Sequence, residues 1–165
     1  MVKLRELLSR LHMARVEFVV VGGVAARVNG STLLTEDLDV CCNMTEDNMS
    51  RLVEAIEPLH PLMRGDPRKL KVPMNPALLT RVNTLIMTTD LGSFDLLSEV
   101  EPIGRYDAVL KQSFEAEVEG HPTRVLNIDA LIAAKRKAGR EKDKLGLLHL
   151  DSAKKRREQT GKGPT

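Results

Sequence analysis

The strongest constraint on the fold is a short run of residues that would be poorly tolerated on a water-exposed surface. Phe18-Val19-Val20-Val21 is continuously apolar and mostly β-branched, and it ends at Gly22-Gly23. Such a run is typical of a strand buried on both faces, because its side chains alternate between the two faces and none is polar. A buried strand needs other strands beside it and helices above and below it. We therefore expect the chain to fold around a central sheet.

The remaining periodicity predicts helices that alternate with strands early in the chain and hairpins later. Thr45 and Asn127 are predicted N-caps, since each precedes a helical pattern. Residues 58–80 hold five prolines and form the least regular segment. Helices are expected over 2–14, 24–28, 46–57, 128–138 and from 141, with one or two helical turns within 105–112; further strands are expected over 38–42, 84–88, 93–97, 114–118 and 121–126.

This order of elements predicts an α/β or α+β domain, in which helices pack on a mixed β-sheet. The length of 165 residues suits a single domain. We expect that domain to span residues 1–158. Residues 159–165 are polar and contain glycine, so a disordered tail is expected there.

Composition narrows the class of protein. Charged residues make up 29% of the chain and aromatic residues only 2%, which argues against a surface that stacks single-stranded bases. No apolar run is long enough to cross a bilayer, and the N-terminus lacks the apolar region of a signal peptide. We therefore expect a cytoplasmic protein with no membrane partner. Cys41 and Cys42 are adjacent, so they point to opposite faces of a strand and suggest buried packing rather than a disulfide or a zinc site.

Two aspartates begin the strand predicted over 38–42. Because strand side chains alternate, Asp37 and Asp39 point to one face while Leu38 points to the core. Carboxylates that close repel each other, and a divalent cation between them removes the repulsion. Mg²⁺, or Mn²⁺ in its place, prefers such carboxylate oxygens together with water and phosphate oxygens. The alternative is a pair of exposed aspartates at the end of a strand.

Asp95 lies in a second apolar run, Ser93-Phe94-Asp95-Leu96-Leu97. A carboxylate between Phe and Leu is costly to bury without a partner. If this strand lies beside the strand that carries Asp37 and Asp39, Asp95 completes a cluster of three carboxylates, and a metal ion supplies the partner. The alternative is that Asp95 pairs with an arginine or caps a turn.

Two further features suit a phosphate ligand. Gly22-Gly23 follows a strand and opens a helix, so the backbone can approach phosphate closely, although a tight turn would need the same residues. Lys135, Arg136, Lys137 and Arg140 can bind a triphosphate or can compensate a helix dipole. From residue 135 onward there are 11 Lys and Arg against 4 Asp and Glu, whereas the rest of the chain is acidic. That asymmetry suits a polyanion-binding surface or a solvated basic helix.

Three of these motifs occur in an order that resembles the DNA polymerase β-like nucleotidyltransferase superfamily. Gly22-Gly23 is followed after thirteen residues by Asp37-Leu38-Asp39-Val40, and Asp95 stands on a later strand. Within the superfamily, the chain is most similar to small bacterial and archaeal nucleotidyltransferase-like proteins related to abortive-infection toxins. Segments 35–40, 91–97 and 131–143 carry that similarity, which covers roughly residues 18–150.

The resemblance implies a nucleotidyltransferase fold and a reaction. Asp37 and Asp39 would bind metal and triphosphate, and Asp95 would bind a second metal and act on the acceptor hydroxyl. Gly22, Gly23, Thr35, Lys135, Arg136 and Arg140 would form the nucleotide-binding residues, and Asp143 would support their helix. The expected function is metal-dependent transfer of a nucleoside monophosphate from a nucleoside triphosphate to a hydroxyl of RNA, a protein or a small molecule.

Two other functions stay open. Proteins of the family that the chain resembles often carry an arginine shortly before the position of Thr35, where this chain has Leu33 and Leu34. A fold kept as a nucleotide- or partner-binding module without turnover, such as half of a toxin–antitoxin pair, fits that difference. A basic RNA-binding domain that acts through its C-terminal segment is the third reading, and it predicts strongly salt-dependent RNA affinity.

Overall fold

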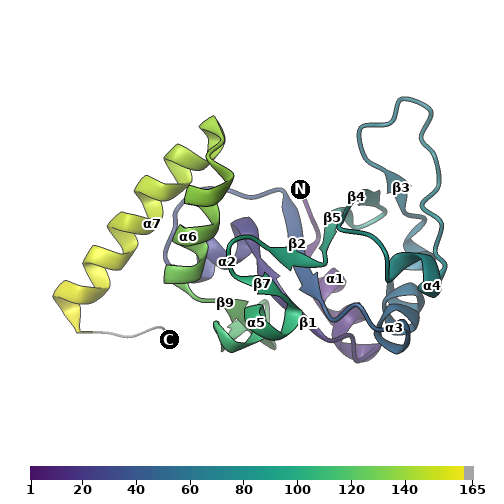
Figure 1. Ribbon diagram of the computed structural model, residues 1–165, viewed down its shortest axis with the longest axis horizontal. Helices are drawn as coiled ribbons and strands as arrows, with labels where there is room; N and C mark the ends of the chain where they lie inside the picture. Colours follow the sequence, from purple (N-terminus) through teal and green to yellow (C-terminus); the bar gives the residue numbers. More distant parts are fainter. Residues whose placement is uncertain (162–165) are drawn as a thin grey trace.

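A seven-stranded mixed sheet forms the centre of the computed structural model, which describes residues 1–161 (Figure 1). The strand order is β3-β4-β5-β2-β1-β9-β8. The pairs β2–β5 and β1–β9 are parallel, and the other neighbours are antiparallel. The strands are β1 Phe18–Val21, β2 Asp37–Cys42, β3 Leu62–Met63, β4 Thr84–Thr89, β5 Gly92–Leu97, β8 Ser113–Val118 and β9 His121–Leu126, and a separate ribbon pairs β6 Glu99–Val100 with β7 Gly104–Arg105.

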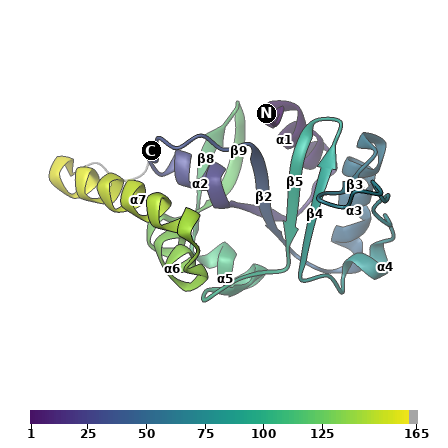
Figure 2. The same cartoon turned by 90° about the horizontal axis from the view of Figure 1, so that it is seen from above.

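The helices gather toward the two ends of the molecule. In two perpendicular views α6 and α7 lie side by side at one end, and α3 and α4 lie at the other (Figures 1 and 2). Within the part of the chain that the structure describes, no helix is both long and apolar enough to span a membrane. The helices are α1 Leu4–Met13, α2 Gly22–Val28, α3 Glu46–Ile56, α4 Pro76–Leu79, α5 Tyr106–Lys111, α6 Ile128–Ala138 and α7 Glu141–Thr160, with a 3-10 turn at Glu57–Leu59.

The prediction of a mixed sheet with packed helices is confirmed. The Thr45 and Asn127 side chains accept hydrogen bonds from the N–H groups of Asn48 and Ala130, as their predicted role as N-caps requires. The differences lie in the proline-rich segment, where the sequence does not predict β3 and α4, in the β6–β7 ribbon, which it does not predict either, and at the C-terminus. Helix α7 continues to Thr160, so the expected tail from 159 is helical at its first two residues, and residues 162–165 lie outside the described chain.

A single cluster of buried apolar side chains fills the space between sheet and helices. All four residues of β1 are buried, as the apolar run predicts. Cys41 and Cys42 are free and fully buried, and burial raises the pKa of the Cys41 thiol to about 12. Both cysteines therefore act as small apolar core residues, in agreement with the sequence.

The two strands that lead into the centre of the sheet are joined by one buried amide. Asn48, at the start of α3, is fully buried. Its Nδ2 donates to the carbonyls of Glu17 and Asn43 at 2.9 and 2.8 Å, and its Oδ1 accepts from the N–H of Glu17 at 2.7 Å. Glu17 precedes β1 and Asn43 follows β2. The amide therefore fixes α3 to both strands.

Asn48→Ala is expected to lower the free energy of unfolding by about 2–4 kcal/mol, because the fully buried amide and its three part-buried hydrogen bonds to the backbone of Glu17 and Asn43 are lost. Urea denaturation followed by circular dichroism measures the change. Asn75→Ala is the matched control, since Asn75 caps α4 through one exposed hydrogen bond. Its loss should cost only about 1 kcal/mol. Equal effects of the two substitutions would contradict the role assigned to Asn48.

Candidate functional site

Three carboxylates meet where β2 and β5 run side by side. In this parallel pair Asp39 is in register with Asp95, and Asp37 is in register with Ser93. Leu38 is fully buried between the two aspartates of β2, which is the alternation that the sequence predicts. Asp95 is only 8% exposed. Asp37, Asp39 and Asp95 therefore share one face of the sheet and line one cavity.

Gly22 and Gly23 allow the cluster to form against the start of α2. Gly22 has a φ of +62°, and a Cβ there would overlap Asp39 Oδ2 and lie 2.8 Å from Asp39 Cγ. A Cβ on Gly23 would lie 2.5 Å from the Oγ1 of Thr35. The backbone N–H of Gly23 donates a hydrogen bond to the Asp39 carboxylate. Only glycine at both positions lets the α2 backbone lie this close to Asp39 and Thr35.

Arg64 is a site residue that the sequence analysis missed. It follows β3, and its Nη2 donates to Asp95 Oδ2 at 2.7 Å. Its Nη1 lies 3.5 Å from Asp37 Oδ1, an ion pair without hydrogen-bond geometry. The alternative reading of Asp95, that it pairs with an arginine, therefore describes this structure. Arg64 lies in the irregular segment, where no periodicity or motif marks it.

The repulsion among the carboxylates is concentrated on Asp39. Burial, the charges of Asp95 and Asp37, and a hydrogen bond that protonated Asp39 shares with Asp95 raise the pKa of Asp39 to about 6, against the lowering effect of the Gly23 N–H. Asp95 Oδ1 is buried and has no hydrogen-bond partner among the described residues. The cluster thus holds more negative charge than its surroundings neutralise.

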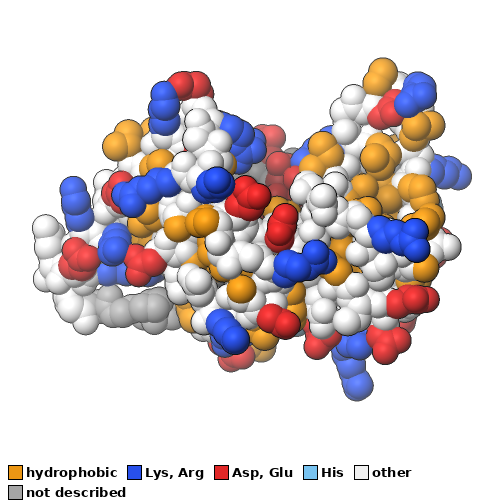
Figure 3. All heavy atoms as spheres, viewed as in Figure 1, with side chains coloured by type: hydrophobic (Ala, Val, Ile, Leu, Met, Phe, Trp, Pro, Cys, Tyr) orange, Lys and Arg blue, Asp and Glu red, His pale blue; other side chains and the backbone are white. Residues whose placement is uncertain are grey.

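The cavity is bounded on its other side by cations from α6 and α7. It has a volume of about 570 Å³, and Lys135, Arg140 and Lys142 line it together with the three aspartates. Figure 3 shows the surface hollowed between the α6–α7 pair and the segment around β3, with acidic and basic side chains along the hollow. Anionic and cationic walls therefore face one space, which suits a ligand that carries phosphate and is bound through a cation.

Asp143 holds two of these cations in place. It is 3% exposed, and its carboxylate accepts from Arg140 Nε at 2.7 Å and lies 3.7 Å from Lys135 Nζ. Burial alone would raise the pKa of Asp143, but the hydrogen bond and charge of Arg140, with the charge of Lys135, lower it below its usual range. The carboxylate is therefore ionised and orients both side chains toward the cavity wall.

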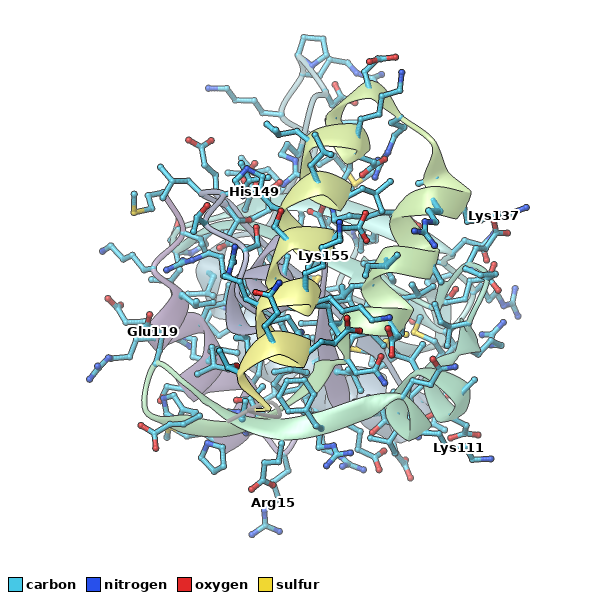
Figure 4. The ribbon with its side chains drawn as sticks, turned by 90° about the vertical axis from the view of Figure 1, so that its left-hand side faces the viewer. Arg15, Lys111, Glu119, Lys137, His149 and Lys155 are labelled. Carbon is cyan, nitrogen blue, oxygen red and sulfur yellow. The ribbon has the colours of Figure 1, made fainter. Side chains whose placement is uncertain are left out.

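Most of the predicted site residues come together, and two do not. Asp37, Asp39, Asp95, Gly22, Lys135 and Arg140 line the cavity, and Gly23 contacts it through Asp39. Thr35 packs on Gly23 and borders a different cavity, with Val24 and Leu34. The Arg136 side chain is 66% exposed, points out of the cavity wall and lies 3.9 Å from Asp151. Its neighbour Lys137 is directed outward from α6 (Figure 4).

The donor set fits a hard divalent cation under one condition. Three carboxylates are the oxygen ligands that Mg²⁺ and Mn²⁺ prefer, and the unpartnered Asp95 Oδ1 lacks a positive group. Among residues 1–161, however, no three His, Cys, Asp or Glu side chains are already arranged as a metal-binding group. Arg64 occupies oxygens of two of the carboxylates. The residues therefore fit a cation once Arg64 has turned away.

Comparison with known proteins adds no assignment. No protein-family model matches the chain, and no curated protein matches it either. The chemistry of the site therefore has to be argued from its own residues.

Gly22→Ala tests the close approach of α2 to Asp39. Gly120 is the matched control, because it also has a positive φ but an added Cβ there meets no atom within 4 Å. Gly120→Ala should cost about 1–2 kcal/mol of unfolding free energy for the backbone conformation alone. Gly22→Ala should cost a further ~1–3 kcal/mol for the overlap. The double variant Gly22→Ala/Asp39→Ala should regain part of this additional loss of unfolding free energy, because the Asp39 side chain that the new Cβ overlaps is removed. Denaturant titration gives each value, and equal losses at the two glycines would contradict the overlap.

Asp39→Asn should stabilise the protein at neutral pH in the presence of a chelator. The pKa of Asp39 is about 6 in the folded protein and 3.8 without the fold. The folded state therefore binds the proton more tightly, and the penalty for ionising Asp39 is absent below about pH 4 and complete above about pH 7. The gain from the substitution should reach about 1–3 kcal/mol at pH 8 and vanish at pH 4. Thermal unfolding of both proteins across this range measures it. A stability gain that grows toward low pH would contradict a raised pKa of Asp39.

Proposed function

We propose that this chain is a metal-dependent nucleotidyltransferase with the DNA polymerase β-like fold. The observation that carries the proposal is the register of β2 with β5, which sets Asp39 against Asp95 while Asp37 shares their face. A helix that begins at Gly22-Gly23 between β1 and β2 supports it further. Those features match the three motifs on which the resemblance rests.

The size and lining of the cavity support a nucleoside triphosphate as the ligand. A volume of about 570 Å³ is within the usual range for small-molecule sites. The carboxylates at one wall would meet the phosphates through the cation. Lys135, Arg140 and Lys142 at the other wall would contact phosphate oxygens directly, and Arg140 can do so with two parallel hydrogen bonds.

The proposed reaction is an in-line displacement at the α-phosphate, with an acceptor hydroxyl as nucleophile and pyrophosphate as leaving group. Bound divalent cations would supply charge stabilisation for the attacking and leaving oxygens. Asp37 and Asp39 would orient the phosphates, and the Gly23 N–H would hold the Asp39 carboxylate in position. Asp95 would accept the proton of the acceptor hydroxyl, for which its Oδ1 has no competing donor among the described residues.

One observation favours a second function. Arg64 already neutralises part of the acidic cluster through Asp95 and Asp37. A permanent ion pair there would suit a nucleotide- or partner-binding module without turnover, such as a component of a toxin–antitoxin pair. Leu33 and Leu34, where proteins of the superfamily that the motifs resemble often carry an arginine, agree with that function. The acceptor of the transferase, whether RNA, protein or small molecule, stays undefined in either case.

Transfer of label from α-labelled nucleoside triphosphates is the test of the proposed activity. The protein is incubated with Mg²⁺ or Mn²⁺ and with RNA, protein and small-molecule acceptors. Asp39→Asn should reduce transfer at least about 100-fold, because metal-supplied charge stabilisation is worth several kcal/mol. Asp90→Asn is the control, since Asp90 is exposed and pairs with His60 outside the cavity.

The outcomes separate the two functions. Transfer that depends on Asp39 and not on Asp90 supports the enzyme. Triphosphate binding by calorimetry without transfer to any acceptor favours the binding module. Transfer by Asp39→Asn at the parental rate contradicts the proposed mechanism.

A further inference from the structure

Arg64 is the one cation that contacts the carboxylate cluster among the residues that the structure describes. It bridges Asp95 at 2.7 Å and Asp37 at 3.5 Å, and its side chain is 28% exposed. The cations on the opposite wall have a different partner, since Lys135 and Arg140 both face Asp143. Arg64 therefore acts alone on the acidic wall of the cavity.

The backbone of Arg64 is fixed, so only its side chain can change partners. The N–H of Arg64 donates to the carbonyl of Ile86 in β4 at 3.2 Å. The preceding residue, Met63, pairs with Met87 and donates to the carbonyl of Leu70 at 2.8 Å. Arginine has a long side chain with several rotatable bonds, so its guanidinium can swing several ångströms from a fixed Cα.

A guanidinium and a divalent cation compete for these oxygens. Both seek Asp95 and Asp37, and two positive groups within a few ångströms repel each other strongly in a partly buried site. The proposed cation site can therefore fill only when Arg64 leaves it. A cation that enters gains the contacts that Arg64 gives up.

A displaced Arg64 has a suitable partner nearby. It already lines the cavity that Lys135 and Arg140 face from the other side. Its Nη1 makes only the 3.5 Å ion pair with Asp37 and no hydrogen bond among the described residues, so this donor loses no hydrogen bond when the side chain turns toward an anion. The planar guanidinium matches phosphate oxygens better than carboxylates spaced on two strands.

We propose that Arg64 has two alternative partners: it neutralises Asp37 and Asp95 in the absence of a divalent cation, and it binds the phosphates of the triphosphate after the cation has replaced it. This inference rests on the cation site of the proposed function. It makes the two ligands cooperative, because the cation releases the arginine that the triphosphate uses. Arg64 also supplies the cationic group that Leu33 and Leu34 do not.

Titration with Mn²⁺ alone, followed by electron paramagnetic resonance of the free ion, tests the first partner. Arg64→Gln should bind Mn²⁺ at least about tenfold more tightly than the parent protein, since the competing charge is gone. Arg68→Gln is the matched control on the same segment. Arg68 is 73% exposed and pairs with Asp66, so its loss should leave Mn²⁺ affinity unchanged. Arg64→Gln/Asp39→Asn should lose the gain, which assigns the ion to the carboxylates.

Calorimetry with a non-hydrolysable triphosphate analogue at saturating Mn²⁺ tests the second partner. Here Arg64→Gln should bind the analogue at least about tenfold more weakly than the parent, the opposite direction to its effect on Mn²⁺. Arg64→Lys keeps a charge at the site and should lie between the parent and Arg64→Gln in both measurements. That variant also gives the comparison if Arg64→Gln proves unstable.

The Mn²⁺ titration and the calorimetry together decide whether Arg64 has the two proposed partners. Tighter Mn²⁺ binding with weaker analogue binding supports the proposal. Mn²⁺ binding that is equal or weaker in Arg64→Gln overturns it and leaves the cation site intact. Unchanged analogue binding overturns the phosphate role of Arg64. Absence of Mn²⁺ binding in the parent and in Arg64→Gln overturns both this inference and the proposed function.

Discussion

Repulsion between carboxylates on two neighbouring strands is the constraint on which the rest of the site depends. The parallel register of β2 and β5 forces Asp39 and Asp95 together, and strand alternation adds Asp37 to the same face. A fold maintains such an arrangement only if nearby groups offset it. Here the offset comes from the Gly23 N–H and the Arg64 guanidinium, each contributed by a different element. The remaining negative charge is what the proposed divalent cation would neutralise.

The rest of the fold brings those elements to the cluster. Buried β1 lies beside β2 and ends at Val21, and α2 begins at Gly22, directly over Asp39. Strand β3 lies at the edge of the sheet next to β4, and Arg64 follows it. Helices α6 and α7 close the cavity with basic residues. Sheet order, rather than any single motif, therefore determines which charges share the cavity.

The sequence predicts what depends on local order and misses what depends on long-range packing. Periodicity gives β1, β2 and α6, and the alternation of Asp37, Leu38 and Asp39 gives the acidic face, because each signal lies within a few residues. Arg64 has no such signal. It reaches Asp95 through the β3–β4–β5 pairing, in a segment whose prolines hide the strand. Arg136 and Arg140 look equivalent in the sequence. In the structure Arg136 lies on α6 and pairs with Asp151, whereas Arg140 follows the left-handed turn at Gly139, caps α7 and lines the cavity.

The burial of Asp143 links the packing of two helices to the charge of the basic wall of the cavity. Its carboxylate stands at the start of α7, while Lys135, which it holds, belongs to α6 and packs its side chain on Gly146 of α7. The alignment of the two helices therefore fixes where the basic wall of the cavity lies.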